Sequence, residues 1–130
     1  MSKIIASIIL LLVLSVYISA QSKNNWMSGT WRGTGHEVAD GKTWTMKLVA
    51  GNGKYEITYP SLRCGGEWKL IRFWSRSARF AERIRYGASK CEPSGKVVIK
   101  RLKGDRIKFR YYYNGERRIA SYATLYRRRR

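Results

Sequence analysis

The chain is poor in the residues from which most enzymes build an active site. Its 130 residues include one histidine, two cysteines and eight aspartates and glutamates, against 27 lysines and arginines. No nucleophile elbow, metal-binding histidine pair or phosphate-binding loop is present. The length also excludes a two-domain enzyme with a cleft between its lobes. We therefore expect a protein without enzymatic activity, cofactor or metal.

Helical periodicity is missing as well. No segment keeps a helical spacing of apolar residues for ten residues, and eight short runs rich in β-branched and aromatic residues occur instead. The runs cover residues 29–38, 43–50, 54–59, 67–74, 79–86, 96–102, 106–113 and 117–126. Asn-Gly pairs at 52–53 and 114–115 favour two-residue hairpin turns, which need positive φ. The sequence predicts one all-β domain over 29–126, a small antiparallel meander that forms either a calycin-like up-and-down barrel or a compact sandwich.

Long apolar runs are absent after the first twenty residues. Residues 1–20 carry only Lys3 as a charge, then an apolar stretch, and end in Ser19-Ala20. This pattern is typical of a secretory signal peptide cut before Gln21, whereas an uncleaved anchor would need about 20 apolar residues to cross a bilayer. We expect a secreted or extracytoplasmic protein with a flexible segment at 21–28. Loss of Lys3 with the signal would lower the net charge from +19 to +18.

The expected location outside the cytoplasm bears on the bonding state of the two cysteines. In exported chains, a pair of cysteines most often forms one structural disulfide; a reactive thiol pair is the alternative. A metal site would need further ligands, and no histidine lies near either cysteine. In a meander, alternate connections lie at the same end of the sheet, and Cys64 and Cys91 fall in two such connections. We predict a Cys64–Cys91 disulfide.

Several motifs share their order with a known β-domain. They are Trp-Arg-Gly at 31–33, Tyr-Pro-Ser-Leu-Arg-Cys-Gly-Gly at 59–66, Phe-Ala-Glu-Arg-Ile at 80–84, and Cys91. Together they resemble the extracytoplasmic domain at the C-terminal end of some bacterial serine/threonine kinases, which also occurs in lone secreted proteins. The resemblance implies the β fold and the Cys64–Cys91 pairing, and no activity. The chain departs from that group in lacking a kinase part and in its many basic residues. Gly-Thr-Trp at 29–31 is similar to the opening of lipocalin-like barrels.

Positive charge is the main functional signal, and it is concentrated in the second half of the chain. Self-repulsion at this density is destabilising, which favours an anionic partner, and guanidinium groups suit phosphate, sulfate or carboxylate. We predict a secreted, non-enzymatic binding protein for an anionic extracellular polymer or surface, such as acidic polysaccharide, envelope lipid or nucleic acid. A direct antimicrobial effect would be one form of this interaction, and a merely solubilising surface is the alternative. The candidate anion-binding residues are Arg72, Arg83, Arg85, Lys100, Lys108, Arg110 and a basic tail of Arg127, Arg128, Arg129 and Arg130.

Two other functions stay open. A calycin-like barrel could hold a small ligand in a cavity lined by Trp31, Trp44, Trp68 and Tyr111. A secreted basic hydrolase or nuclease would need His36 to meet an acid such as Glu56 or Glu82 across strands. Glu82 lies on the apolar side of its run, so we expect it either at a barrel mouth or paired with an arginine.

Overall fold

The computed structural model describes residues 25–128. The expected signal peptide, the start of the expected flexible segment, and Arg129 and Arg130 lie outside the described residues. Within the described chain, no helix is both long and apolar enough to pass through a bilayer.

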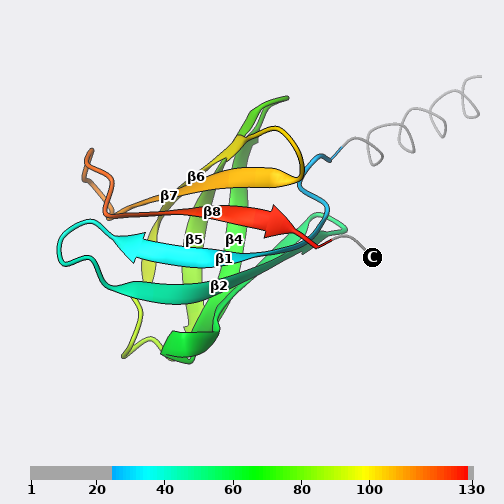
Figure 1. The fold of residues 1–130 in the computed structure, drawn as a ribbon. Coiled ribbons are helices and arrows are strands. Elements are labelled where there is room, and N and C mark those ends of the chain that lie inside the picture. Colours follow the sequence, from blue (N-terminus) through cyan, green and yellow to red (C-terminus); the bar gives the residue numbers. More distant parts are fainter. Residues whose placement is uncertain (1–24, 129–130) are drawn as a thin grey trace, which may run out of the picture.

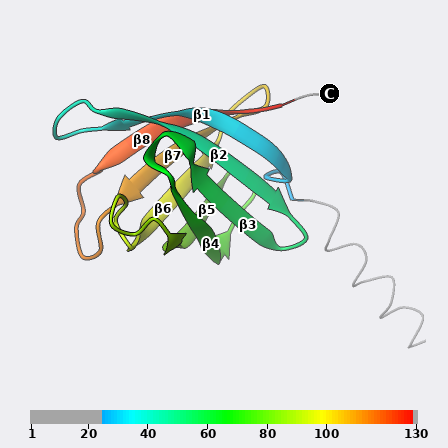
Figure 2. The same cartoon turned by 90° about the horizontal axis from the view of Figure 1, so that it is seen from below.

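Eight antiparallel strands pair in sequence order and close into a barrel, because β1 pairs with β8 (Figures 1 and 2). This outcome confirms the all-β prediction and selects the barrel over the sandwich. The only helical piece in the described chain is a short 3-10 turn, η1 (Pro60–Leu62). The strands are β1 (Gly29–Glu37), β2 (Thr43–Gly51), β3 (Lys54–Tyr59), β4 (Cys64–Phe73), β5 (Ser77–Tyr86), β6 (Ser94–Arg101), β7 (Arg106–Tyr112) and β8 (Ser121–Arg127).

Alternation along the strands fills the barrel with apolar side chains. On β7, Ile107 and Phe109 are buried while Lys108 points outward, as the period of two requires. Trp68 stacks on Phe109 at a centroid distance of 5.6 Å and packs against Phe80 at 5.5 Å. The middle of the barrel is therefore a packed core rather than a channel.

Of the two hairpin turns predicted at Asn-Gly pairs, the structure has the first as predicted and differs at the second. Asn52 and Gly53 both have positive φ, 53° and 73°, which matches the predicted two-residue turn between β2 and β3. At the second Asn-Gly pair, only Gly115 has positive φ. A tight turn does form there, because the Glu116 N–H bonds to the Tyr113 carbonyl at 3.1 Å, but it does not join two strands directly. The expected two-residue hairpin connection and the start of the last strand at 117 are therefore wrong: β8 begins at Ser121 after a loop of residues 113–120. The exposed polar residues of that loop have no apolar alternation to hold them in a sheet.

Residues 25–28 pack across one end of the barrel, which we call the closed end. Met27 is fully buried, and its carbonyl oxygen accepts a hydrogen bond of 2.8 Å from the Trp31 indole. Trp26 donates its indole N–H to the Trp74 carbonyl at 2.9 Å. Both ends of the described chain lie at this end (Figure 1).

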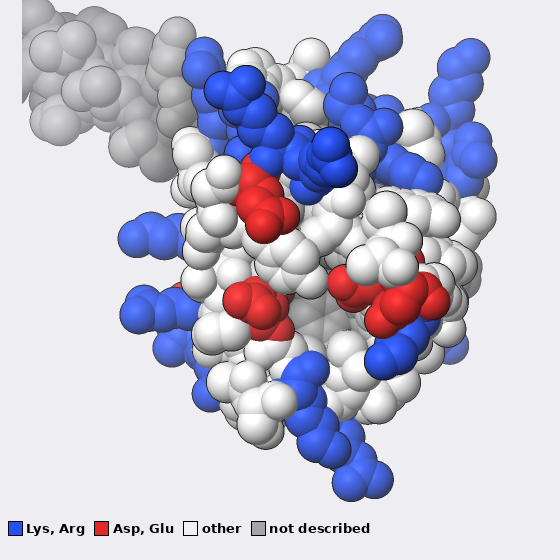
Figure 3. All heavy atoms as spheres, turned by 90° about the vertical axis from the view of Figure 1, so that its left-hand side faces the viewer, with Lys and Arg blue, Asp and Glu red and all other residues white. Residues whose placement is uncertain are grey.

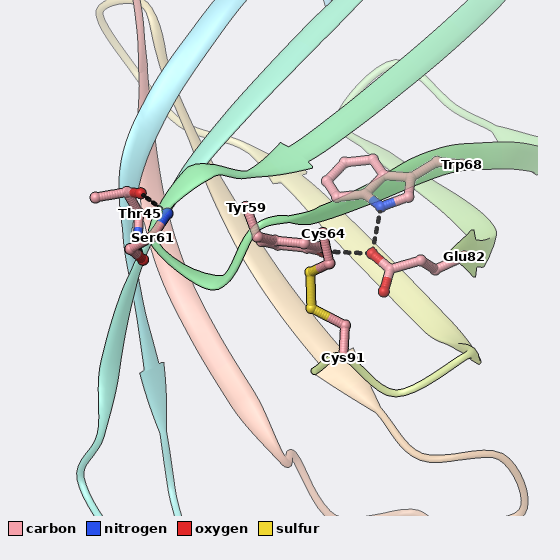
Figure 4. Close-up of a disulfide and its surroundings, with 7 residues drawn as sticks. All are labelled: Thr45, Tyr59, Ser61, Cys64, Trp68, Glu82 and Cys91. Atoms are coloured by element: carbon pink, nitrogen blue, oxygen red, sulfur yellow. Dashed lines mark hydrogen bonds between the residues drawn. A yellow bond between two sulfur atoms is a disulfide. The ribbon is translucent and has the colours of Figure 1, made fainter. Parts of the chain in front are cut away.

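The opposite end, which we call the mouth, carries the β1–β2, β3–β4, β5–β6 and β7–β8 connections. The predicted disulfide is present there: Cys64 at the start of β4 is bonded to Cys91 in the β5–β6 connection, with their Cα atoms 6.4 Å apart (Figure 4). It joins two connections that are not neighbours in sequence and so fixes one side of the mouth.

Candidate functional site

The mouth opens into a cavity of about 540 Å³. Its lining combines aromatic side chains with carboxylates, among them Trp44, Tyr111, Glu37 and Glu92. The buried floor is provided by Phe109 and Glu82. A cavity of this volume falls within the range of small-molecule sites, about 300–1,000 Å³.

Glu82 is the buried carboxyl of the barrel, and it settles one of the questions that the sequence leaves open. It points inward from β5, is 4% exposed, and takes part in none of the ion pairs of the described chain. Its Oε2 accepts hydrogen bonds from the Trp68 indole at 2.8 Å and from the Tyr59 hydroxyl (Figure 4). Glu82 is therefore a barrel-mouth residue and is not paired with an arginine.

Burial changes the acid–base behaviour of this group. Loss of solvent raises the pKa of Glu82, while the hydrogen bonds from Tyr59 and Trp68 oppose that rise. Burial and the neighbouring Glu82 also raise the pKa of Tyr59 well above its usual value. Tyr59 thus stays protonated and continues to donate to the carboxyl.

The tyrosines on the wall of the cavity have their hydroxyls engaged. Tyr111 donates to the Ser94 carbonyl at 3.0 Å, and Tyr113 donates to Glu37 Oε1 at 3.1 Å. Their rings meet edge to face with centroids 5.7 Å apart. What these residues offer to a molecule in the cavity is therefore mainly their aromatic rings.

Acidic residues gather at the mouth of this strongly basic chain. Of the eight acidic residues, four line the cavity: Glu37, Asp40, Glu82 and Glu92. Viewed onto the mouth, the acidic side chains surround a hollow and the basic side chains project from the periphery (Figure 3). Two lysines, Lys42 and Lys90, are the basic residues in the lining. The mouth thus differs in charge from the rest of the barrel.

The outer surface of β4–β7 has the opposite character, and we call it the basic face. It comprises the outward residues Lys69, Arg72, Arg79, Arg83, Arg85, Lys96, Lys100, Lys108 and Arg110. Cross-strand partners put like charges directly opposite one another, Arg72 opposite Arg79 and Lys100 opposite Lys108. No outward position of β5, β6 or β7 holds a carboxylate.

Several cations of the basic face lie over aromatic rings. The guanidinium groups of Arg72 and Arg79 flank Trp74, at 4.8 and 5.7 Å from its ring centroid. Lys108 lies 5.0 Å from the Tyr122 ring. Such contacts hold the cations in place and leave their other sides free for a partner.

A second hollow, of about 580 Å³, lies at the closed end and continues the basic character. Arg76, Arg101, Lys103 and Arg106 contribute to its lining. Arg76 and Arg101 are joined by a backbone hydrogen bond of 2.8 Å, and each is next in sequence to an outward strand position, Ser77 and Lys100. The basic face and this hollow therefore adjoin.

The predicted anion-binding residues separate into two groups. Arg72, Arg83, Lys100, Lys108 and Arg110 all belong to the basic face. Arg85 lies there too but forms an ion pair with Glu67 of β4. Arg127, expected in the basic tail, instead ends β8 and bonds to residues of the closed end, whereas Arg128 is exposed.

The four residues proposed to line a single cavity are divided between both ends of the barrel. Trp44 and Tyr111 line the mouth cavity, and Trp31 lines the hollow at the closed end. Trp68 is 2% exposed in the core between them; it lies beneath the mouth cavity, stacked on Phe109 and bonded to Glu82, and does not line the cavity itself. One cavity lined by all four is therefore not what the structure shows.

The residues considered for hydrolysis do not meet. His36 lies on the outer surface of β1, stacked on Tyr122 of β8 at 5.2 Å, whereas Glu82 points into the barrel. Among the described residues, no group of three or more histidine, cysteine, aspartate or glutamate side chains could hold a metal ion.

Sequence reasoning missed the assembly of the mouth. Glu37 ends β1 and Asp40 follows it in the β1–β2 connection, whereas Glu92 lies in the β5–β6 connection, and only the order of strands around the barrel brings the two groups together. The one available signal was Glu82, a carboxylate on the apolar side of an alternating strand. In comparisons with protein-family models, curated proteins and solved structures, no significant match to the chain was found.

Proposed function

We propose that the protein is a secreted, non-enzymatic binding protein that holds an anionic extracellular polymer or surface on its basic face. The observation that carries this proposal is the composition of that face: outward positions on β5–β7 include several lysines and arginines and no carboxylate. Glu67 of β4, the carboxylate on this side of the barrel, is paired with Arg85, whereas a surface that served solubility alone would intersperse both signs of charge.

The register of the strands adds an energetic argument. Like charges directly opposite in an antiparallel pair destabilise the sheet, typically by a few tenths of a kcal/mol. The pairs Arg72–Arg79 and Lys100–Lys108 both carry this cost. An anionic chain lying across β4–β7 would remove the repulsion and release its own counterions, so binding would be mostly Coulombic.

Further features support export and contact with a polymer. The apolar N-terminal segment favours secretion, and the Cys64–Cys91 disulfide is compatible with an oxidising compartment. Arg72 and Arg79, held over the Trp74 ring, present planar guanidinium groups that could stack on a base of such a partner. The adjoining basic hollow at the closed end could hold one anionic group of the same partner.

Retention on immobilised heparin at increasing salt tests this proposal. We expect the affinity of the unaltered protein to fall steeply with salt, and the double variant Lys100→Gln/Lys108→Gln to flatten the logarithmic salt slope by about 2, one unit for each lost contact. The matched control is Arg32→Gln/Lys47→Gln, which removes another directly opposed basic pair, from the β1–β2 surface. We expect it to change the slope by less than half as much.

Two results would contradict the proposal. If retention hardly changed between low and high salt, binding would not be Coulombic. If both double variants weakened retention equally, the charge would act as an even coat rather than through the basic face.

A further inference from the structure

The mouth cavity has a chemistry that the proposed polyanion binding does not use. Its carboxylates would repel an anionic polymer, and its volume of about 540 Å³ suits a small molecule. Three observations about this cavity point to the kind of molecule that would fit.

The first observation is an available oxygen on a buried carboxyl. Both hydrogen bonds to Glu82 end on Oε2, and Oε1 has no hydrogen-bond partner among the described residues (Figure 4). Every fully enclosed side-chain oxygen or nitrogen of the described chain has a hydrogen-bond partner. Because Oε1 has none, it is not fully enclosed, and a molecule in the cavity that Glu82 lines can reach it. A ligand entering the mouth therefore meets an acceptor already fixed in position by Trp68 and Tyr59.

The second observation is the local charge. Four carboxylates, Glu37, Asp40, Glu82 and Glu92, line the cavity against two lysines, and both lysines are exposed whereas Glu82 is buried. Lys42 is exposed and lies 3.7 Å from Asp40, and no described basic side chain forms an ion pair with Glu82. On a protein that otherwise repels cations, the mouth is the place where a cation would be attracted.

The third observation is the aromatic wall. Trp44, Tyr111 and Tyr113 line the cavity, and both tyrosine hydroxyls are already engaged. Aromatic rings beside a carboxylate bind an ammonium or guanidinium group well, because the negative ring faces attract the cation and the carboxylate accepts its protons.

We propose that the mouth cavity binds a small organic cation, an amine or guanidinium compound, whose charged group donates to Oε1 of Glu82 between the rings of Trp44, Tyr111 and Tyr113. An uncharged apolar ligand would cover Oε1 without giving it a donor, which is costly for a buried group. A bare metal ion lacks the ligand set that it would need in the described residues.

Calorimetric titration with benzamidine, agmatine and spermidine tests this inference, with benzamide as the uncharged counterpart of benzamidine. We expect at least one of the cations to bind with a dissociation constant below about 1 mM, and benzamide to bind at least ten-fold more weakly than benzamidine. Glu82→Gln keeps an acceptor for Trp68 and Tyr59 but removes the charge, and it should weaken binding at least ten-fold. Glu56→Gln removes an exposed carboxylate from the outer surface of β3 and should change the affinity less than two-fold.

A second variant covers the case in which Glu82→Gln unfolds. Trp44→Leu keeps an apolar, half-buried side chain at the mouth but removes a ring, and it should weaken binding several-fold. The inference is overturned if no cation binds with a dissociation constant below about 1 mM, if benzamide binds as well as benzamidine, or if a folded Glu82→Gln or Trp44→Leu variant retains full affinity. None of these results depends on heparin binding, so this inference and the proposed polyanion binding can fail separately.

Discussion

Arg127 offers the sharpest test of how the closed end is held together. Its side chain is 31% exposed and bonds to three groups from distant parts of the chain. Nε and Nη2 donate to Asp105 Oδ1 at 3.1 and 2.7 Å, and Nη1 donates to the carbonyl oxygens of Trp26 and Ser28 at 3.1 and 2.9 Å. The guanidinium also lies 4.7 Å from the Trp31 ring centroid. One side chain thus joins β8, the β6–β7 turn and the N-terminal segment.

The expected cost of Arg127→Ala follows from these contacts. The two bonds to backbone carbonyls contribute about 1 kcal/mol each, and the partly exposed pair with Asp105 contributes about 1 kcal/mol after solvent screening. The ring contact adds about 0.5 kcal/mol. We expect the free energy of unfolding, measured by urea denaturation, to fall by about 3.5 kcal/mol, which is a large share of the stability of a small domain.

The neighbouring arginine supplies the control. Arg128→Ala makes the same change of charge at an exposed side chain whose backbone N–H bonds to the Thr30 carbonyl, so the free energy of unfolding should move by less than about 0.5 kcal/mol. Combining Arg127→Ala with Asp105→Asn in a double-mutant cycle should give a coupling energy of about 1 kcal/mol. Asparagine tolerates the positive φ of 51° at position 105. If the two alanine variants had equal stability, Arg127 would be one more solvated charge and the reasoning would be refuted.

Two further predictions concern the mouth. Cys64→Ala/Cys91→Ala should lower the free energy of unfolding in urea by roughly 3–4 kcal/mol, because the bridge closes a loop with a sequence separation of 27; a loss below about 1 kcal/mol would contradict this. Burial raises the pKa of Glu82, so the folded state keeps the carboxyl proton to a higher pH than the unfolded state does. The stability that this proton contributes is therefore fully present below the ordinary glutamate pKa and is lost as the pH rises through the raised pKa. Glu82→Gln should therefore gain stability relative to the unaltered protein as pH increases from about 4, and a stability difference that stayed constant across a series of urea titrations at different pH would be evidence against it.

The fold was predictable from local patterns, whereas the sites depend on strand order. Alternation such as Ile107, Lys108, Phe109 marks a strand without any knowledge of its neighbours, and the Asn52-Gly53 turn is fixed by its own φ preferences. The Cys64–Cys91 pairing followed from counting connections in a meander. By contrast, the number of acidic residues does not reveal that four of them share one end of a barrel.

The errors have the same origin. Arg127 looks like the first residue of a solvated basic tail, because nothing in its sequence neighbourhood shows that Asp105 and the carbonyls of Trp26 and Ser28 lie within its reach. Asn114-Gly115 carries a hairpin signal as strong as that of Asn52-Gly53, but the polar residues that follow it give the sheet no apolar face to extend. In both cases, contacts or their absence elsewhere in the barrel decide what the local pattern leaves open.

Closure of the barrel also sets the order in which the protein can become stable. Gly33 on β1 pairs with Leu125 on β8, and a Cβ atom at position 33 would lie only 2.4 Å from the Thr124 carbonyl oxygen, so the seam depends on close contact between strands almost a hundred residues apart. Until β8 has been synthesised, β1 and β7 are open edges and the core lacks one wall, which makes early folding unfavourable and slow. Any substitution that adds a Cβ atom at position 33 would therefore push β1 away from β8 and open the barrel along this seam. The joint between the first and last strands thus completes the barrel only once the whole domain has been synthesised.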